Sequence, residues 1–217
     1  MTLSGHDSRL NKKFSGDRMT ATTRSDGNEE PRPTKRANLK VCGTCSLCCK
    51  VYDIDDLGKK AGETCNHTRR EGGCGVWGLH PQICQDFKCL WLKHDDMTAL
   101  WRPDLCGFVL RVEPNGTTLA VDVDPDRPDA WRTPHYYDQL KIWSEVMPKN
   151  EGLVVVYVPN GMYVITPMED LFLKAPKRGD ILETGMENSL FGLRPFARVI
   201  PAREIRKDRS NLIKRRA

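Results

Sequence analysis

The sequence has no long run of apolar residues. Its first 36 residues contain no stretch that resembles a secretory signal, and no segment approaches the roughly 18 consecutive apolar residues of a membrane-spanning helix. We therefore expect a cytoplasmic protein that is not embedded in a membrane. Cysteines stay reduced in such a compartment, so a dense group of them indicates metal binding or catalysis before disulfides.

The middle of the chain has no excess of basic charge. The net charge is +5, but residues 1–38 contribute about +3 and residues 203–217 about +5, which leaves about −3 for the rest. A body with mild negative charge is a poor surface for a polyanion. We therefore do not expect nucleic acid as a partner. A zinc-ribbon-like module for nucleic-acid or protein interaction, using the basic ends, is kept as an alternative.

Nucleotide-binding and acid–base signatures are missing as well. No glycine-rich loop stands between a predicted strand and a predicted helix, and no paired carboxylates accompany a candidate base. The residues therefore predict no catalytic site and no nucleotide cofactor. Whether the protein is an enzyme stays open at this point.

The two ends of the chain lack apolar periodicity. Residues 1–38 are rich in Ser, Thr, Arg, Asp and Gly, which predicts a disordered polar segment. If translation starts at Met19, residues 1–18 are an upstream extension. Residues 203–217 form a basic tail. These ends help to explain a hydrophobic share of only 39%.

No cysteine follows Cys106, although the chain has 9 of them. This change in composition predicts a cysteine-rich metal-binding module at 39–106 and an α+β region at 107–202. In the second region, alternating apolar residues flank two Asn-Gly pairs, which predicts two β-hairpins. The hairpins span Phe108–Asp124 and Leu153–Thr166.

A helix is predicted between the two hairpins. Thr133 is a suitable N-cap with Pro134 at the first helical position, and apolar residues recur at helical spacing until Pro148. The predicted fold is therefore α+β, with a small antiparallel sheet of two hairpins and a helix packed on one face. The stretch "PFARVIPARE" is expected to add an edge strand.

Four cysteines lie within eight positions in the stretch "CGTCSLCC". Two residues between Cys42 and Cys45 let a tight turn aim both sulfurs at one ion, and Gly43 adds no bulk there. Cys45 and Cys48 repeat the spacing. Adjacent side chains diverge, so we expect Cys48 and Cys49 to serve different metal centres.

Eight cysteines in all lie between residues 42 and 89, and they divide evenly into two sets of four. A four-cysteine set suits tetrahedral zinc and an iron–sulfur cluster equally well. We therefore expect two centres that hold zinc or iron. The predicted ligands are Cys42, Cys45, Cys48, Cys49, Cys65, Cys74, Cys84 and Cys89.

The residues Cys42–Cys49 resemble the signature of the CxxCxxCC family, the YkgJ-like cysteine-cluster proteins described as zinc- or iron-chelating. The stretch Gly72–Leu92 resembles that family's second block, with His80–Pro81 where the family has Arg-Pro. The resemblance covers about residues 40–107 and implies the same eight ligands. A flagellin lysine methylase carries a related cluster, so a metal-cluster-dependent enzyme is an alternative function.

Other residues of the module have simpler interpretations. We interpret Cys106 as a small buried hydrophobe and His67 as a hydrogen-bond partner of a ligand sulfur or an exposed residue. Asp86 is explained by a surface contact. Four aromatic residues are expected to form an apolar wall around the metals: Trp77, Phe87, Trp91 and Trp101.

Taken together, these patterns predict a metal-binding protein that holds, senses or delivers metal or passes electrons. Its expected partners are metal ions, and the sequence identifies no protein partner.

Overall fold

The computed structural model describes residues 40–147, 152–177, 179–190 and 192–204. The predicted disordered segment 1–38, the helix stop at Pro148 and most of the basic tail 203–217 lie outside the described residues. Within them, the fold is α+β, as predicted. No helix of the described residues has the length and apolar character needed to cross a membrane.

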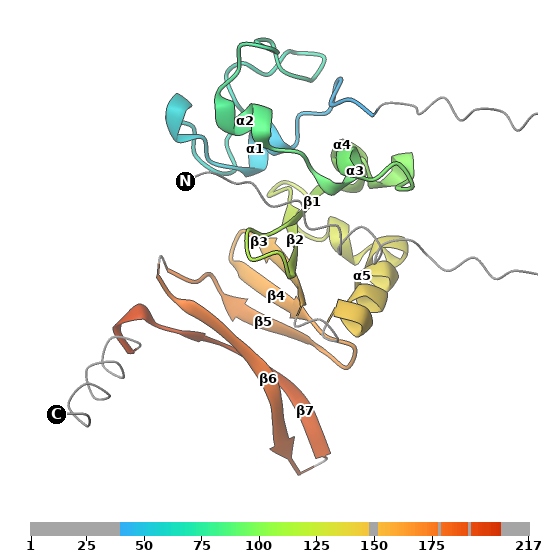
Figure 1. Ribbon diagram of the computed structural model, residues 1–217, viewed down its shortest axis with the longest axis vertical. Helices are drawn as coiled ribbons and strands as arrows, with labels where there is room; N and C mark the ends of the chain where they lie inside the picture. Colours follow the sequence, from blue (N-terminus) through green and yellow to red (C-terminus); the bar gives the residue numbers. More distant parts are fainter. Residues whose placement is uncertain (1–39, 148–151, 178, 191, 205–217) are drawn as a thin grey trace, which may run out of the picture. The chain divides into compact units, whose positions relative to one another are not determined.

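A five-stranded sheet forms the centre of the described chain, and its strands follow one another in sequence order (Figure 1). Four of the five strands contain a run of buried residues, which places the sheet in the core. The strands are β1 (Phe108–Val112), β2 (Thr118–Val123), β3 (Leu153–Val158), β4 (Gly161–Ile165) and β5 (Asp170–Lys174).

The expectation of an antiparallel sheet is wrong for one pair of strands. β1–β2, β3–β4 and β4–β5 are antiparallel, whereas β2 and β3 are parallel. The chain crosses from the end of β2 to the start of β3 through the helix α5 (Pro134–Val146), and such a crossover returns it in the same direction. The two predicted hairpins are therefore joined side by side into one mixed sheet.

The two hairpin turns differ in the role of glycine. Gly116 lies in the first turn with φ +73°, and the side chain of Asn115 accepts hydrogen bonds from two following amides. In the second hairpin Val158 pairs with Gly161, so the loop is Pro159–Asn160 and the glycine already belongs to β4. A Cβ on Gly161 would lie 2.2 Å from the carbonyl oxygen of Leu173. Close packing against β5 therefore requires this glycine.

The helix α5 covers one face of the sheet, as predicted, and contacts β3 and β4 (Figure 1). It begins with Pro134 directly after Thr133, whose side chain makes no capping hydrogen bond. Leu140 is fully buried beneath the helix, and the ring of Tyr136 packs edge-on against Phe108 of β1 at 5.2 Å. This contact identifies the helix-facing side of β1.

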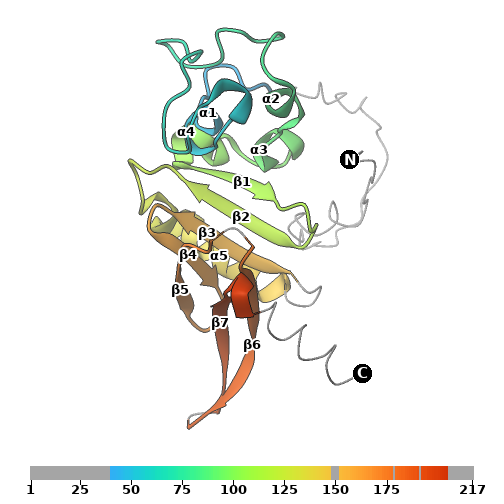
Figure 2. The same ribbon diagram turned by 90° about the vertical axis from the view of Figure 1, so that its left-hand side faces the viewer.

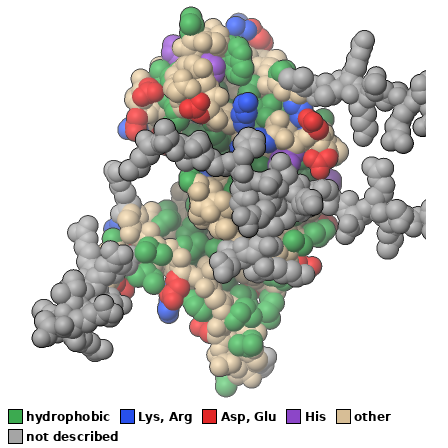
Figure 3. Space-filling view, in the orientation of Figure 1, with side chains coloured by type: hydrophobic (Ala, Val, Ile, Leu, Met, Phe, Trp, Pro, Cys, Tyr) green, Lys and Arg blue, Asp and Glu red, His purple; other side chains and the backbone are tan. Residues whose placement is uncertain are grey.

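The stretch "PFARVIPARE" does not extend the sheet. Its first six residues, 195–200, belong to β7 (Gly192–Ile200), which pairs antiparallel with β6 (Ile181–Ser189) in a separate two-stranded sheet, and its last four lie beyond the strand. Cross-strand ion pairs of Glu183 with Arg198 and of Glu187 with Arg194 line one face of this hairpin. Met186 and Leu193 of this hairpin are exposed. Hydrophobic side chains are visible on the surface of the molecule in Figure 3.

The cysteine-rich part has four short helices joined by loops, gathered at the β1 side of the sheet (Figure 2). α3 and α4 contact β1. Successive side chains of a strand point to opposite faces, so Val109 faces away from α5, toward the cysteines. The helices are α1 (Cys48–Val51), α2 (Gln82–Asp86), α3 (Leu90–Lys93) and α4 (Pro103–Cys106).

One hydrophobic core crosses the predicted boundary at Cys106. Leu47, Leu90 and Trp101 from the cysteine-rich part belong to the same cluster of buried residues as Phe108 and Leu140. The change in composition near Cys106 is therefore not a gap in packing. Whether the two parts unfold separately stays a prediction.

Candidate metal centre

The eight predicted ligands line a single cavity of about 330 Å³. They reach it from α1, from α2, from the residue before α3 and from the intervening loops. Cys106 is the one cysteine that does not line the cavity, and it is 2% exposed. The structure therefore brings together the set that spacing and resemblance predict and separates it from the ninth cysteine.

The turn between Cys42 and Cys45 has the form expected of a metal knuckle. The amide of Cys45 donates a hydrogen bond to the carbonyl oxygen of Cys42 at 2.8 Å, and Gly43 has φ +53°. The amides of Leu47 and Asp104 donate to the sulfur of Cys45, which favours its thiolate, although burial is stronger and raises the pKa of this thiol.

Gly72 and Gly73 hold a second segment against this turn. A Cβ on Gly72 would lie 2.2 Å from the carbonyl oxygen of Thr44, and one on Gly73 would lie 2.3 Å from that of Gly43. Only glycine permits this approach, which brings the segment ending in Cys74 to the knuckle. This role was not predicted from the sequence, although the pair "GG" directly before Cys74 is its signal.

Cys48 and Cys49 lie side by side in α1. The thiol of Cys48 donates a hydrogen bond to the sulfur of Cys49, which raises the pKa of Cys48 and, together with the positive charge of Lys59, lowers that of Cys49. Burial adds to the rise at Cys48. The two adjacent thiols therefore differ in their readiness to ionise.

Backbone contacts tie Cys49 to the loop that carries Cys65 and Cys74. The amide of Cys65 donates to the carbonyl oxygen of Cys49 at 3.1 Å. Thr68 and Cys74 form an isolated antiparallel bridge, closed by a 2.7 Å hydrogen bond from Gly75 to His67. The loop thus returns Cys74 to the neighbourhood of Cys65.

Cys84 lies within α2, and Cys89 is the last residue of the short link between α2 and α3. Cys89 precedes α3, and the amides of Trp91 and Leu92 donate to its sulfur. Burial nevertheless raises the pKa of Cys89, and burial followed by the charges of Cys49, Cys65 and Cys74 raises that of Cys84.

The thiols do not converge on a ready coordination point. Across the described residues, no group of three or more His, Cys, Asp or Glu side chains is arranged to hold a metal ion. The residue types and their shared cavity fit zinc or an iron–sulfur cluster, because both take four thiolates. Binding requires the sulfurs of a set to move together.

Two histidines share the cavity with the cysteines. His67 lines it, and His80 lines it with its ring stacked on Trp77 at 4.8 Å and its Nδ1 accepting a hydrogen bond from Gly78. Asp86 is exposed and accepts a hydrogen bond from Gln82, a surface contact that involves no metal.

The predicted aromatic wall is correct for three of its four members. Trp77, Phe87 and Trp91 line the cavity, although Trp77 remains 62% exposed. Trp101 does not line it. This side chain is buried in the core, where its ring contacts those of Tyr136 and other aromatic residues. The strand and helix that surround Trp101 are distant in sequence, so composition alone could not separate it from the others.

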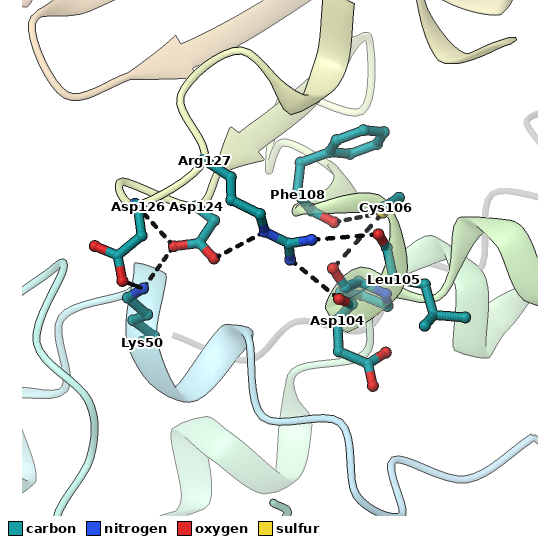
Figure 4. A network of polar contacts seen from close by, with 9 residues as sticks. Lys50, Asp104, Leu105, Cys106, Phe108, Asp124, Asp126 and Arg127 are labelled. Carbon is teal, nitrogen blue, oxygen red and sulfur yellow. Dashed lines mark hydrogen bonds and ion pairs between the residues drawn. The ribbon is translucent and has the colours of Figure 1, made fainter. Parts of the chain in front are cut away.

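A polar network ties α1 to the sheet and to α4 (Figure 4). Lys50, directly after Cys49, pairs with the buried Asp124 at 2.7 Å and with Asp126 at 2.5 Å. Arg127 extends the network, donating to the carbonyl oxygens of Asp104 and Leu105 while its Nε lies 3.4 Å from Asp124. The network therefore positions the helix that carries the two adjacent cysteines.

At the centre of this network, charge and hydrogen bonding together outweigh burial in setting the pKa values of Asp124 and Lys50. Burial opposes the ionisation of Asp124, but the hydrogen bond from Lys50 and the charges of Lys50 and Arg127 hold its pKa below the ordinary value. Burial likewise opposes the charge of Lys50, and Asp124 and Asp126 raise its pKa above the ordinary value.

No protein-family model, no curated protein and no solved structure matches this chain.

Proposed function

We propose that this protein binds zinc or iron, the latter as an iron–sulfur cluster, through its eight cavity-lining cysteines. The observation that carries the proposal is that one cavity is lined by eight of the nine cysteines and excludes Cys106. A core of free thiols has no reason to make this selection. The resemblance to the CxxCxxCC family points to the same eight residues.

We further propose two centres. The first set is Cys42, Cys45, Cys48 and Cys89, and the second set is Cys49, Cys65, Cys74 and Cys84.

The support for the first set is the knuckle together with its electrostatic neighbours. Cys42 and Cys45 share one turn. After burial, the charge of Cys89 is the largest influence of another cysteine on the pKa of Cys42, which rises to about 11, and Cys89 also acts on Cys45. The hydrogen bond with Cys49 and burial raise the pKa of Cys48 most, and the charges of Cys42 and Cys45 raise it further.

The support for the second set is its backbone. Cys49 and Cys65 share a hydrogen bond, and the bridge at Thr68 returns Cys74 to them. After burial, the charges of the other three cysteines of this set raise the pKa of Cys84. Cys49 and Cys74 also act on Cys42, so the two sets adjoin.

A bound zinc would cross-link loops that have little core of their own, and an iron–sulfur cluster would in addition carry an electron. The protein's own contribution is to present the thiols, to direct amides at Cys45 and Cys89, and to shield the cavity with Phe87 and Trp91. These properties suit a protein that holds, senses or delivers metal, or passes electrons.

The direct test is anaerobic purification followed by metal analysis and an absorption spectrum. We expect close to two metal centres per chain. A colourless protein with zinc indicates structural sites, and a brown protein with a broad band in the visible range indicates iron–sulfur. A chain with fully reduced thiols that retains neither metal would overturn the proposal.

The division into sets has its own test. Cys84→Ser should remove the second centre and leave the first, and Cys89→Ser should do the reverse. Loss of the same single centre in both variants, with the other intact, contradicts the assignment.

A further inference from the structure

Lys59 is one of the few buried charged residues of the cysteine-rich part. It is 7% exposed, and its ammonium donates to the carbonyl oxygen of Lys50 at 2.8 Å and to that of Tyr52. Its backbone bridges to Ile54, which holds the side chain in place. Lys59 does not itself line the cavity, but the carbonyl oxygen of Lys50 that it contacts belongs to the residue directly after the cavity-lining Cys49.

Burial without an ion partner is costly for an ammonium group. Within the described residues, no carboxylate forms an ion pair with Lys59. The anionic groups that act on it most strongly are the thiols of Cys65 and Cys49, followed by the carboxylates of Asp53 and Glu63. The fold therefore holds a buried cation whose charge interacts with Cys49 and Cys65, two cysteines of the second set.

We propose that Lys59 is the positioning counter-charge of the second cysteine set, selecting for an anionic thiolate centre there. This inference rests on the proposed function. Four thiolates around one divalent cation carry a net negative charge, and a fixed ammonium that is not part of the cavity lining stabilises that charge without occupying a coordination position.

The first set has a different environment. Other cations act there: Lys40 and Lys93 interact with Cys89, and Arg102 interacts with Cys45. Lys40 is only half-buried and donates to the carbonyl oxygens of His94 and Met97. The charges of Asp95 and Asp96 act on Lys40 more strongly than that of Cys89 does. Removing Lys59 should therefore affect one centre and spare the other.

The experiment is a competition titration of the zinc-loaded full-length chain against a chelator. Lys59→Gln removes the charge and keeps a hydrogen-bond donor, Lys59→Met removes both, and Lys59→Arg keeps both. We expect Gln and Met to weaken one of the two sites by about 10- to 100-fold, and Arg to bind within a few-fold of the wild type. The exposed neighbour provides the control Lys60→Gln, which should match the wild type.

Two backgrounds locate the effect. With Cys89→Ser, only the second centre remains and Lys59→Gln should weaken it. With Cys84→Ser, only the first remains and Lys59→Gln should leave it unchanged. Wild-type affinity in Lys59→Gln would assign the residue to hydrogen bonding and overturn the inference, and so would equal weakening of both sites. If the wild-type chain binds two zinc ions, the proposed function stands whatever the Lys59 variants do. If the wild-type chain binds no zinc, both the proposed function and this inference are wrong.

Discussion

Gly72 and Gly78 have the same backbone φ of +89° but different surroundings. A Cβ at Gly72 would overlap the carbonyl oxygen of Thr44 at 2.2 Å, whereas a Cβ at Gly78 would meet nothing within 4 Å. The pair therefore separates the conformational role of glycine from its role in close packing at the cysteine knuckle.

This pair predicts a difference in stability. Gly78→Ala should cost about 1–2 kcal/mol of unfolding free energy, the strain of a left-handed alanine. Gly72→Ala should cost distinctly more and should also lower the metal content, because the loop must move away from the turn. Denaturant titration and metal analysis of both variants measure this. Equal costs would mean that the contact with Thr44 contributes nothing.

Cys106 is the built-in control among the cysteines. Burial raises its pKa to about 12, and its thiol lies 3.1 Å from the carbonyl oxygen of Phe108, within reach of a hydrogen bond. We expect Cys106→Ser to keep the wild-type metal load, because serine can donate the same hydrogen bond. Cys45→Ser should lose metal. If metal analysis finds equal losses, Cys106 belongs to a centre and one of the eight does not.

At the scale of elements, a buried carboxylate contributes to the attachment of α1 to the sheet. The side chain of Asp124 is 9% exposed and that of Asp126 is 78% exposed, yet both pair with Lys50. Buried charge-assisted hydrogen bonds contribute more than exposed ones because water competes less for them.

Asp124→Asn should therefore cost about 1.5–3 kcal/mol of unfolding free energy at pH 7. The control, Asp126→Asn, should cost less than about 1 kcal/mol. The folded-state pKa of Asp124 is below its unfolded value. Its stabilisation is thus present above about pH 4 and is lost as the pH falls through the folded pKa. Denaturation at several pH values should show the gap between wild type and Asp124→Asn closing on acidification. A gap independent of pH would contradict the role of this charge.

At the scale of the whole molecule, the chain combines a core-rich sheet with loops that have few aliphatic residues. β1–β4 and α5 bury a run of Val, Leu and Ile side chains, whereas the stretch between Cys42 and Cys84 buries little besides Leu47 and Ile54. A part this small gains little from hydrophobic burial, and metal supplies the difference in proteins of this kind.

Metal removal should therefore act unevenly. We expect a strong chelator, or oxidation of an iron–sulfur centre, to abolish the hydrogen-exchange protection of amides between Cys42 and Cys84. The amides of β2, β3 and α5 should stay protected. Leu90 and Trp101 belong to the shared core, and their protection shows where the boundary between the two parts lies. Uniform loss along the chain would mean a single cooperative unit.

Local signals were enough to predict much of the fold. Residues close in sequence define the apolar alternation around Asn115–Gly116 and the helix that begins at Pro134. The absence of cysteine after Cys106 likewise can be read directly from the sequence. The α+β class follows from them. For the candidate site, the local spacing of Cys42, Cys45 and Cys48, the even number of cysteines up to Cys89 and the family resemblance predicted eight ligands, all of which line the cavity, and the isolated Cys106 does not.

Only the tertiary structure decided which distant residues meet. The parallel pairing of β2 with β3 depends on the path of α5. The placement of Trp101 in the core, the contact of Gly72 with Thr44 and the burial of Lys59 beside Cys49 and Cys65 join residues that no local pattern relates. Periodicity and spacing report on neighbours within a few residues, whereas packing and charge compensation depend on distances in space.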